Sequence, residues 1–302
     1  MSILRNACIP ILFLAGCGAR SGLDSSGGAT AAGGLASTGG TSAAGGVAST
    51  GSNQATGCTG SFETLQSSTG LCVAKMTAIT APNGYPNYAI DMTEVTKGQY
   101  DAWLATHPAF PPKADANCGY VTTYRGESSD LTYRGPDAEH HPVVWVDWCG
   151  AYSYCKGVGK RLCGAISGGS NAYTEYADAS ASQWHRACSS AGTYTYPYGN
   201  TYNSTYCDGY DYRIGNGSLT GQTITVASLG SCVTSTNGYA GVYDLSGNVR
   251  EWEDSCISTG QLAACRLRGG AFWDQGPLTC GREDSDQRSS AAIYIGFRCC
   301  SQ

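Results

Sequence analysis

Cysteine is the residue type that most limits how this chain can fold. The 302-residue sequence contains 16 cysteines, of which Cys8 and Cys17 lie in a predicted leader and at a predicted lipidation site. The other 14 extend from Cys58 to Cys300, and an even number in an exported chain predicts up to seven disulfides. A metal cluster is the competing interpretation, but the cysteines lack the paired Cys-x2-Cys spacing of such sites. The sequence therefore predicts an oxidised, disulfide-stabilised domain.

The N-terminus has the features of a bacterial lipoprotein leader. Residues 1–16 combine a positive residue, Arg5, with an apolar stretch from Ala7 to Leu14. That stretch is far shorter than the roughly 20 residues of a membrane-spanning helix. The following sequence Leu-Ala-Gly-Cys predicts diacylation of Cys17, and Gly18 after it favours anchoring in an outer membrane. The alternative is ordinary secretion with an incidental cysteine.

A low-complexity segment separates this anchor from the domain. Residues 17–57 are mostly Gly, Ala, Ser and Thr, which cannot bury enough apolar surface to offset the entropy of ordering, so a flexible tether is predicted. Residues 58–302 form the predicted domain. The net charge of −5 argues against nucleic acid as a partner, because phosphates need a basic surface.

Short secondary-structure elements are predicted within the domain. In the full sequence only 14% of the residues are charged, and the 42 glycines and 20 tyrosines favour ordered loops over long helices. Apolar spacing predicts strands at 88–92 and 141–146 and helices at 96–106, 148–157 and 182–188. Tyr, Gly, Asn and Thr dominate residues 193–241, where we expect irregular structure. The pattern indicates an α+β domain in which loops dominate.

Several blocks in a fixed order point to a known family. They are Glu94-Val95-Thr96, Gly159-Lys160-Arg161-Leu162, the run from Gly241 to Trp252, the run from Arg268 to Trp273, and Gly296-Phe297-Arg298-Cys299. In this order the sequence resembles the formylglycine-generating enzymes, also called sulfatase-modifying factors, over about residues 80–300. The resemblance implies an α+β fold, a loop-rich and disulfide-stabilised variant of the C-type-lectin-like fold.

The resemblance also implies a disulfide and exposes an insertion. In the family, the cysteines at the positions of Cys155 and Cys299 pair with each other. Residues 163–181 interrupt the usual passage from Lys-Arg-Leu into the next helix. We interpret this insertion as a surface loop tied down by a disulfide, with Cys163 and Cys188 as the expected pair.

A calcium site is implied near the strongest block. Calcium prefers several hard oxygen ligands, and the family binds it at the positions of the Asp244 and Glu251 side chains and the Gly247 and Val249 carbonyls. The alternative is that Asp244 caps a turn and Glu251 is a solvated charge. A second family site would lie near Asp208, where the partner carboxylate does not align.

The copper site of the family is not matched. Family enzymes hold Cu(I) with two cysteines and oxidise a cysteine in a Cys-x-Pro-x-Arg motif to formylglycine; a soft ion such as Cu(I) prefers thiolates. Here Ala271 occupies the position of a serine and Asp274 that of the first cysteine, while Cys280 is displaced by one residue from the second. Arg250 replaces a tryptophan that is frequent in the family. No catalytic residue is therefore assigned, and copper is not expected.

Other catalytic sites are less well supported. The four histidines, His107, His140, His141 and His185, do not have the spacing of an iron cluster. No Gly-x-Ser-x-Gly nucleophile motif is present. Acidic and basic residues between Arg282 and Arg288 are predicted to form surface ion pairs.

Two functions remain. The first is a lipid-anchored binding module of the cell envelope that holds a peptide, glycan or protein in a cleft lined by aromatic residues such as Phe272 and Trp273. The second is an active formylglycine-generating oxidase with an atypical copper site. The unmatched cysteine pair favours the first, because a fold does not carry a function without its site.

Overall fold

The computed structural model describes residues 57–124, 137–213, 217–218 and 220–301. The predicted leader, Cys17 and the tether up to residue 56 lie outside this part of the chain. Within the described ranges, no helix is long and apolar enough to cross a membrane.

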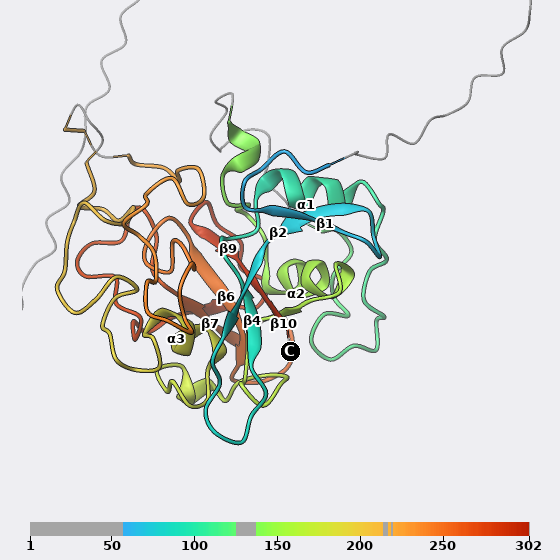
Figure 1. Cartoon of the computed structure of the whole chain (residues 1–302). Helices are drawn as coiled ribbons and strands as arrows, with labels where there is room; N and C mark the ends of the chain where they lie inside the picture. Colours follow the sequence, from blue (N-terminus) through green and yellow to red (C-terminus); the bar gives the residue numbers. More distant parts are fainter. Residues whose placement is uncertain (1–56, 125–136, 214–216, 219, 302) are drawn as a thin grey trace, which may run out of the picture. The chain divides into compact units, whose positions relative to one another are not determined.

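Two four-stranded sheets and a hairpin carry the fold (Figure 1). The hairpin pairs β1 (Glu63–Gln66) with β2 (Leu71–Ala74). The first sheet has the order β3 (Met76–Ile79), β4 (Tyr88–Asp91), β10 (Cys299–Ser301), β5 (Arg161–Leu162). The second has the order β8 (Asp284–Gln287), β7 (Ala264–Arg268), β6 (Arg250–Cys256), β9 (Ile295–Phe297). Because only Arg298 separates β9 from β10, the end of the chain joins both sheets.

Three short α-helices form where the sequence predicted them. A capping box at Thr96 starts α1 (Lys97–Leu104), and Asp147 caps α2 (Trp148–Gly157) by accepting a bond from the Gly150 N–H. Ser182 caps α3 (Gln183–Cys188). Two 3-10 turns lie between these helices, Ala138–His140 before α2 and Tyr173–Glu175 before α3. Figure 1 shows α1 and α2 next to each other and α3 apart from them.

The strand predicted at 141–146 is wrong. This segment forms an isolated bridge between Pro142 and Thr96, with bonds from the Val143 N–H to the Val95 carbonyl and from the Lys97 N–H to the His141 carbonyl, but it belongs to no strand. Trp145 has φ 60°, which no strand accommodates, and its N–H bonds to the Ala292 carbonyl. The apolar run is buried because it passes through the core, not because it belongs to a sheet.

Aromatic rings fill the core between α1, α2 and β9. Tyr100 and Tyr154 stack at 5.7 Å, and both meet the Phe297 ring edge-on. All three are essentially fully buried. Burial of each large side chain stabilises the fold by about 2 kcal/mol, so α1 and α2 are held by packing more than by their own helix propensity.

Seven disulfides join the described residues. They are Cys58–Cys72, Cys118–Cys149, Cys155–Cys299, Cys163–Cys300, Cys188–Cys280, Cys207–Cys232 and Cys256–Cys265. This number indicates an extracellular or cell-envelope protein.

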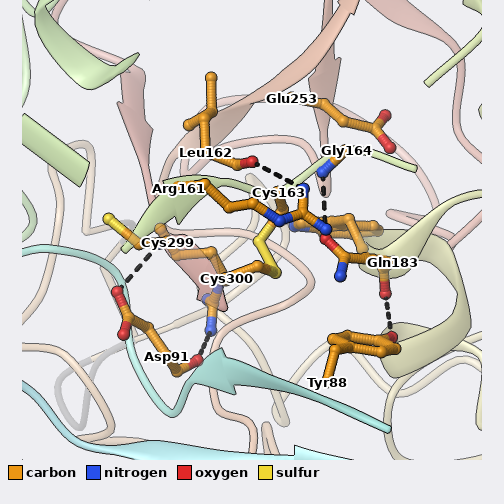
Figure 2. The surroundings of a disulfide bond; sticks show 12 residues. Tyr88, Asp91, Arg161, Leu162, Cys163, Gly164, Gln183, Glu253, Cys299 and Cys300 are labelled. Atoms are coloured by element: carbon orange, nitrogen blue, oxygen red, sulfur yellow. Dashed lines mark hydrogen bonds between the residues drawn. A yellow bond between two sulfur atoms is a disulfide. The ribbon is translucent and has the colours of Figure 1, made fainter. Parts of the chain in front are cut away.

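The expected pairing of Cys163 with Cys188 is wrong. β10 pairs with β5 so that Cys300 lies opposite Arg161, and Cys163 follows two residues later. Cys163 therefore bonds to Cys300, and Figure 2 shows this disulfide between the β5 and β10 segments. Neighbouring residues of a strand point to opposite faces, which leaves Cys299 free to bond to Cys155 of α2.

Candidate functional site

Two residues that depart from the family pattern, Arg250 and Asp274, form one ion pair. Arg250, at the start of β6, donates from Nε to Asp274 Oδ2 at 2.8 Å and from Nη2 to Oδ1 at 2.5 Å. Such a two-pronged guanidinium–carboxylate contact is strong and directional. Asp274 Oδ2 also accepts a bond from the Ala271 N–H at 2.9 Å. The sequence showed the two departures 24 residues apart, and only the fold brings them together.

The cysteine nearest to the second copper position is not a free thiol. Cys280 is bonded to Cys188 of α3 and is 1% exposed. Ala271, at the family's serine position, is fully buried and has no hydroxyl group. Asp274, Cys280 and Ala271 together do not provide the paired thiolates that Cu(I) prefers, so these residues do not fit copper.

An aromatic and charged surface covers this ion pair. Trp273 is 54% exposed and stacks on Tyr294 at 5.3 Å, and the Arg250 guanidinium lies 5.1 Å from the Tyr294 ring centre. Arg282 pairs with Asp284 beside them. We call the group Trp273, Tyr294, Arg250, Arg282 and Asp284 the Trp273 surface. Because stacking on Tyr294 holds the exposed indole, the Trp273 ring is fixed in place.

Phe272 does not belong to this surface. It is 3% exposed, so the expectation that Phe272 lines an open cleft is wrong. The Phe272 N–H donates to the Asn248 carbonyl, and the Phe272 side chain lies in the interior.

The predicted calcium ligands lie in the protein interior. Asp244 accepts a bond from the Ala227 N–H at 2.6 Å, and burial raises the pKa of Asp244 to about 7. Glu251 accepts from Arg298 Nε at 2.6 Å and Nη2 at 2.7 Å, and from Trp184 Nε1 at 2.8 Å. Glu251 is fully buried, which excludes the alternative of a solvated charge. Gly247, between the two acids, approaches Asp208 so closely that a Cβ would lie 2.3 Å from its carbonyl oxygen.

Sequence reasoning missed a further carboxyl group at this place. Glu94 accepts a bond from Asn248 Nδ2 at 3.0 Å, and burial followed by the nearby Asp244 charge raises the pKa of Glu94. Its Oε2 atom and Asp208 Oδ2 are buried without a hydrogen-bond partner among the described residues. The only signal in the sequence was the position of Glu94 in the Glu-Val-Thr block.

The buried carboxyl groups outnumber the positive charge beside them. Glu94, Asp208, Asp244 and Glu251 are all at most 2% exposed, and Arg298 already pairs with Glu251. Buried carboxylates need protons or cations to balance them. The two oxygens without partners and this excess negative charge fit a divalent cation next to Asp244.

The remaining candidate groups are separate from one another. His141 contacts the Thr223 hydroxyl, whereas His185 contacts the Cys280 carbonyl, so these two histidines do not join in a cluster. Of the predicted surface ion pairs, the one between Arg282 and Asp284 is present. Glu283 instead pairs with Arg266 of β7, and Arg288 is buried and bonds to Asn117 and to the Ser258 carbonyl.

Comparison with known proteins relates the chain to one family. The model of the sulfatase-modifying factor enzyme 1-like domain matches residues 45–302, which begins within the predicted tether. No curated protein matches the chain.

Three solved structures are similar to the chain. Treponema denticola variable protein 1 is 17% identical with a TM-score of 0.48, covering 76% of this chain and 95% of its own. PvdO from Pseudomonas aeruginosa is 19% identical with a TM-score of 0.47, covering 76% and 94%. CarF is 18% identical with a TM-score of 0.47, covering 75% and 95%.

Proposed function

Because the chain belongs to the sulfatase-modifying factor enzyme 1-like family, we propose that it is an exported, lipid-anchored member that binds a ligand instead of oxidising one. The observation that carries this proposal is the ion pair between Arg250 and Asp274, where the resemblance places a copper ligand at Asp274. A carboxylate held by a guanidinium is not a Cu(I) ligand. The opposite charges of Arg250 and Asp274 neutralise each other, so this part of the fold stays ordered with both substituted residues.

The Trp273 surface is the proposed binding site. Exposed, rigid aromatic rings give a ligand a large contact area at low entropic cost, and tryptophan and arginine dominate the binding energy of many interfaces. The surface carries charges of both signs: Arg282 and Asp284 pair with each other and lie 3.8 Å from Asp274 and 3.9 Å from Arg250 respectively. The predicted ligands are a glycan, a protein or a peptide. A surface that combines an aromatic ring with both charges fits a polypeptide segment best, because apolar side chains and side chains of both signs follow each other along a polypeptide.

A display selection tests the binding function. The full-length mature protein in detergent micelles is used to select binders from a random peptide library, and enriched peptides are titrated against the wild type and Trp273→Ala. We expect at least tenfold weaker binding by Trp273→Ala, because its indole is the exposed centre of the surface. Tyr85→Ala is the control, since Tyr85 is 48% exposed on the loop between β3 and β4. Enriched peptides that bind all three proteins equally would contradict the proposed site.

The oxidase is the alternative function. The oxidase requires a copper site, and the residues at the expected position do not fit copper in this structure. Cys280 could bind copper only after its disulfide with Cys188 is reduced. Mass spectrometry of a Cys-x-Pro-x-Arg peptide, incubated aerobically with the protein and copper, separates the two functions. We expect unchanged cysteine. Conversion to the aldehyde would overturn the proposal that the protein is catalytically inactive.

Calcium is proposed as a structural ion of the same fold. Asp244, with the carbonyls of Gly247 and Val249, would hold it, and Glu94 is close enough to Asp244 for their charges to interact. Glu251 is the least suited of the predicted ligands, because both its oxygens already accept bonds from Arg298. When bound, the ion would balance the excess buried negative charge.

The cell envelope is the proposed location. Seven disulfides require an oxidising compartment, and lipidation of Cys17 would anchor the domain to a bacterial outer membrane. The low-complexity segment before residue 58 is long enough to hold the domain away from the lipid surface.

A further inference from the structure

The insertion at 163–181 forms one wall of a small cavity. Ser170 Oγ donates to Asp254 Oδ1 at 2.7 Å, and the Asn171 N–H donates to the Asp254 carbonyl at 2.7 Å. Gly164 has no room for a side chain, since a Cβ would lie 2.3 Å from the Gly169 carbonyl oxygen. These contacts place Gly169 and Ser170 beside the end of β6, at the edge of a cavity of about 180 Å3.

The opposite wall is a loop held by a disulfide. Cys118 is bonded to Cys149 of α2, and Asp115 Oδ1 accepts bonds from the N–H groups of Asn117 and Cys118. Arg288 Nη1 donates to Asn117 Oδ1 at 2.6 Å. Among the described residues, the Asn117 Nδ2 group makes no hydrogen bond, so two donors remain available to a ligand.

The cavity continues along α2 into an aromatic groove. Asp115, Cys118 and Tyr152 line both the cavity and a neighbouring groove of about 290 Å3. Tyr152 stacks on the buried Trp148 at 4.9 Å, which fixes its ring. Phe110, 49% exposed, and Tyr124 pack together at 5.0 Å further along the groove.

The geometry points to a glycan site in which the cavity holds a terminal sugar and the groove holds the sugars that follow. A pyranose ring has hydroxyl groups at its edge, which need donors and acceptors such as Asn117, Asp254 and Ser170. It also has C–H-rich faces that pack on aromatic rings. The small cavity with polar walls, opening into a groove lined by aromatic side chains, matches both properties. Among the described residues that line either part, Lys156 is the only cation, whereas Asp115 and Asp254 are carboxylates, so a neutral glycan fits better than an anionic one.

This site is distinct from the Trp273 surface, and neither depends on the other. None of the residues of the Trp273 surface lines the cavity or the groove. The two sites can therefore be tested by separate substitutions in the same protein.

Binding of soluble tetrasaccharides tests the inference. Saturation-transfer NMR is measured on the full-length mature protein with β-1,4-linked glucose, β-1,4-linked N-acetylglucosamine and β-1,4-linked mannose tetramers. We expect at least one tetramer to bind, and Ser170→Leu and Tyr152→Leu each to weaken its binding at least fivefold. Ser170 is exposed, so leucine there narrows the cavity; it also removes the bond to Asp254, and the melting temperature of the variant is therefore measured beside its binding. Trp273→Ala is the control and should bind as the wild type does.

Three results would overturn the glycan site. The first is that no tetramer binds the wild type. The second is that a tetramer binds but both leucine variants, with unchanged melting temperatures, bind it as well as the wild type does. The third is that no tetramer binds, whereas a proline-rich decapeptide binds the wild type but not Tyr152→Leu. That result would assign the groove to a peptide.

Discussion

Arg250 and Asp274 replace two family residues by one interaction. Asp274 is 7% exposed, and its carboxylate also holds the Ala271 N–H, so it organises the loop that carries Trp273. A carboxylate at this depth that lost its partner would be an uncompensated charge. The pair therefore stabilises the folded protein.

We predict that Arg250→Ala and Asp274→Ala each lower the free energy of unfolding by about 2 kcal/mol, measured by urea denaturation. The double variant should lose much less than the sum, because removal of either partner already breaks the pair. Lys97→Ala is the control, since Lys97 pairs with Asp101 on an exposed helix face and such pairs contribute about 0.5 kcal/mol. Additive losses would show that the two residues act independently.

His185 is a second residue with a measurable effect. Burial lowers the pKa of His185, so the folded protein holds this ring neutral at a pH where the unfolded chain, with a pKa of about 6.5, is protonated. The unfolded state then binds more protons, and stability falls as the pH decreases below about 6.5.

We predict that His185→Asn loses this part of the pH dependence. The measurement is the difference in unfolding free energy between wild type and variant at pH 8 and at pH 5; the variant's deficit should be smaller at pH 5. The buried acids, which have raised pKa values, are common to both proteins and cancel in this difference. A deficit that is equal at both pH values would contradict the neutral buried ring.

The residue that caps helix α3 also bonds to a buried carboxylate. Ser182 Oγ accepts a bond from the His185 N–H and donates to Glu253 Oε1. Glu253 is fully buried, and its second carboxylate oxygen has no hydrogen-bond partner among the described residues. Thr96, by contrast, caps α1 within a capping box and contacts no buried acid through its hydroxyl.

We predict that Ser182→Ala lowers the unfolding free energy by about 3 kcal/mol and Thr96→Ala by about 1 kcal/mol. Loss of the helix cap alone accounts for the loss in Thr96→Ala. The additional loss in Ser182→Ala comes from the buried Glu253 carboxylate, which no longer accepts the hydrogen bond from Ser182. Denaturant unfolding of the two variants measures both. Equal losses would show that the Ser182–Glu253 bond contributes nothing beyond the cap.

Elements of the chain differ in how well sequence predicted them. The helix at 148–157 follows from apolar spacing and the capping residue Asp147, which are local properties, and the helix at 182–188 was also predicted from its own residues. The strand predicted at 141–146 failed because apolar residues in a buried coil and in a buried strand look alike. Pairing partners, which distinguish the two, come from distant segments.

Calcium removal tests the charge balance of the whole domain. We expect excess EDTA to lower the melting temperature and added Ca²⁺ to restore it, because the ion would neutralise buried carboxylates. At a hundredfold excess over its dissociation constant, the ion stabilises by about 2.7 kcal/mol. Asp244→Asn should lose most of this response, whereas Asp101→Asn, on the exposed face of α1, should keep it. A melting curve that EDTA leaves unchanged would remove the calcium proposal.

Membrane attachment tests the proposed anchor. We predict that Cys17→Ala moves the protein from the membrane fraction to the soluble fraction, measured by fractionation and by metabolic labelling with a fatty acid. Lipidation would give the chain its hold on the membrane, since the apolar leader stretch is too short to span one. Cys8→Ala is the control and should remain attached. Continued attachment of Cys17→Ala would contradict lipid anchoring.

The sequence by itself determined the family, the short helices and the oxidised state, because these depend on residue identity, local spacing and the number of cysteines. The resemblance also placed Asp274 at the position of a copper ligand, which remains a prediction. The tertiary structure alone decided that Arg250 is the partner of Asp274, that Cys163 pairs with Cys300, that Glu94 lies beside Asp244, and that the insertion forms a cavity wall with Asp254. Each of these contacts joins residues from different elements, and their distance in space depends on how the sheets and loops pack.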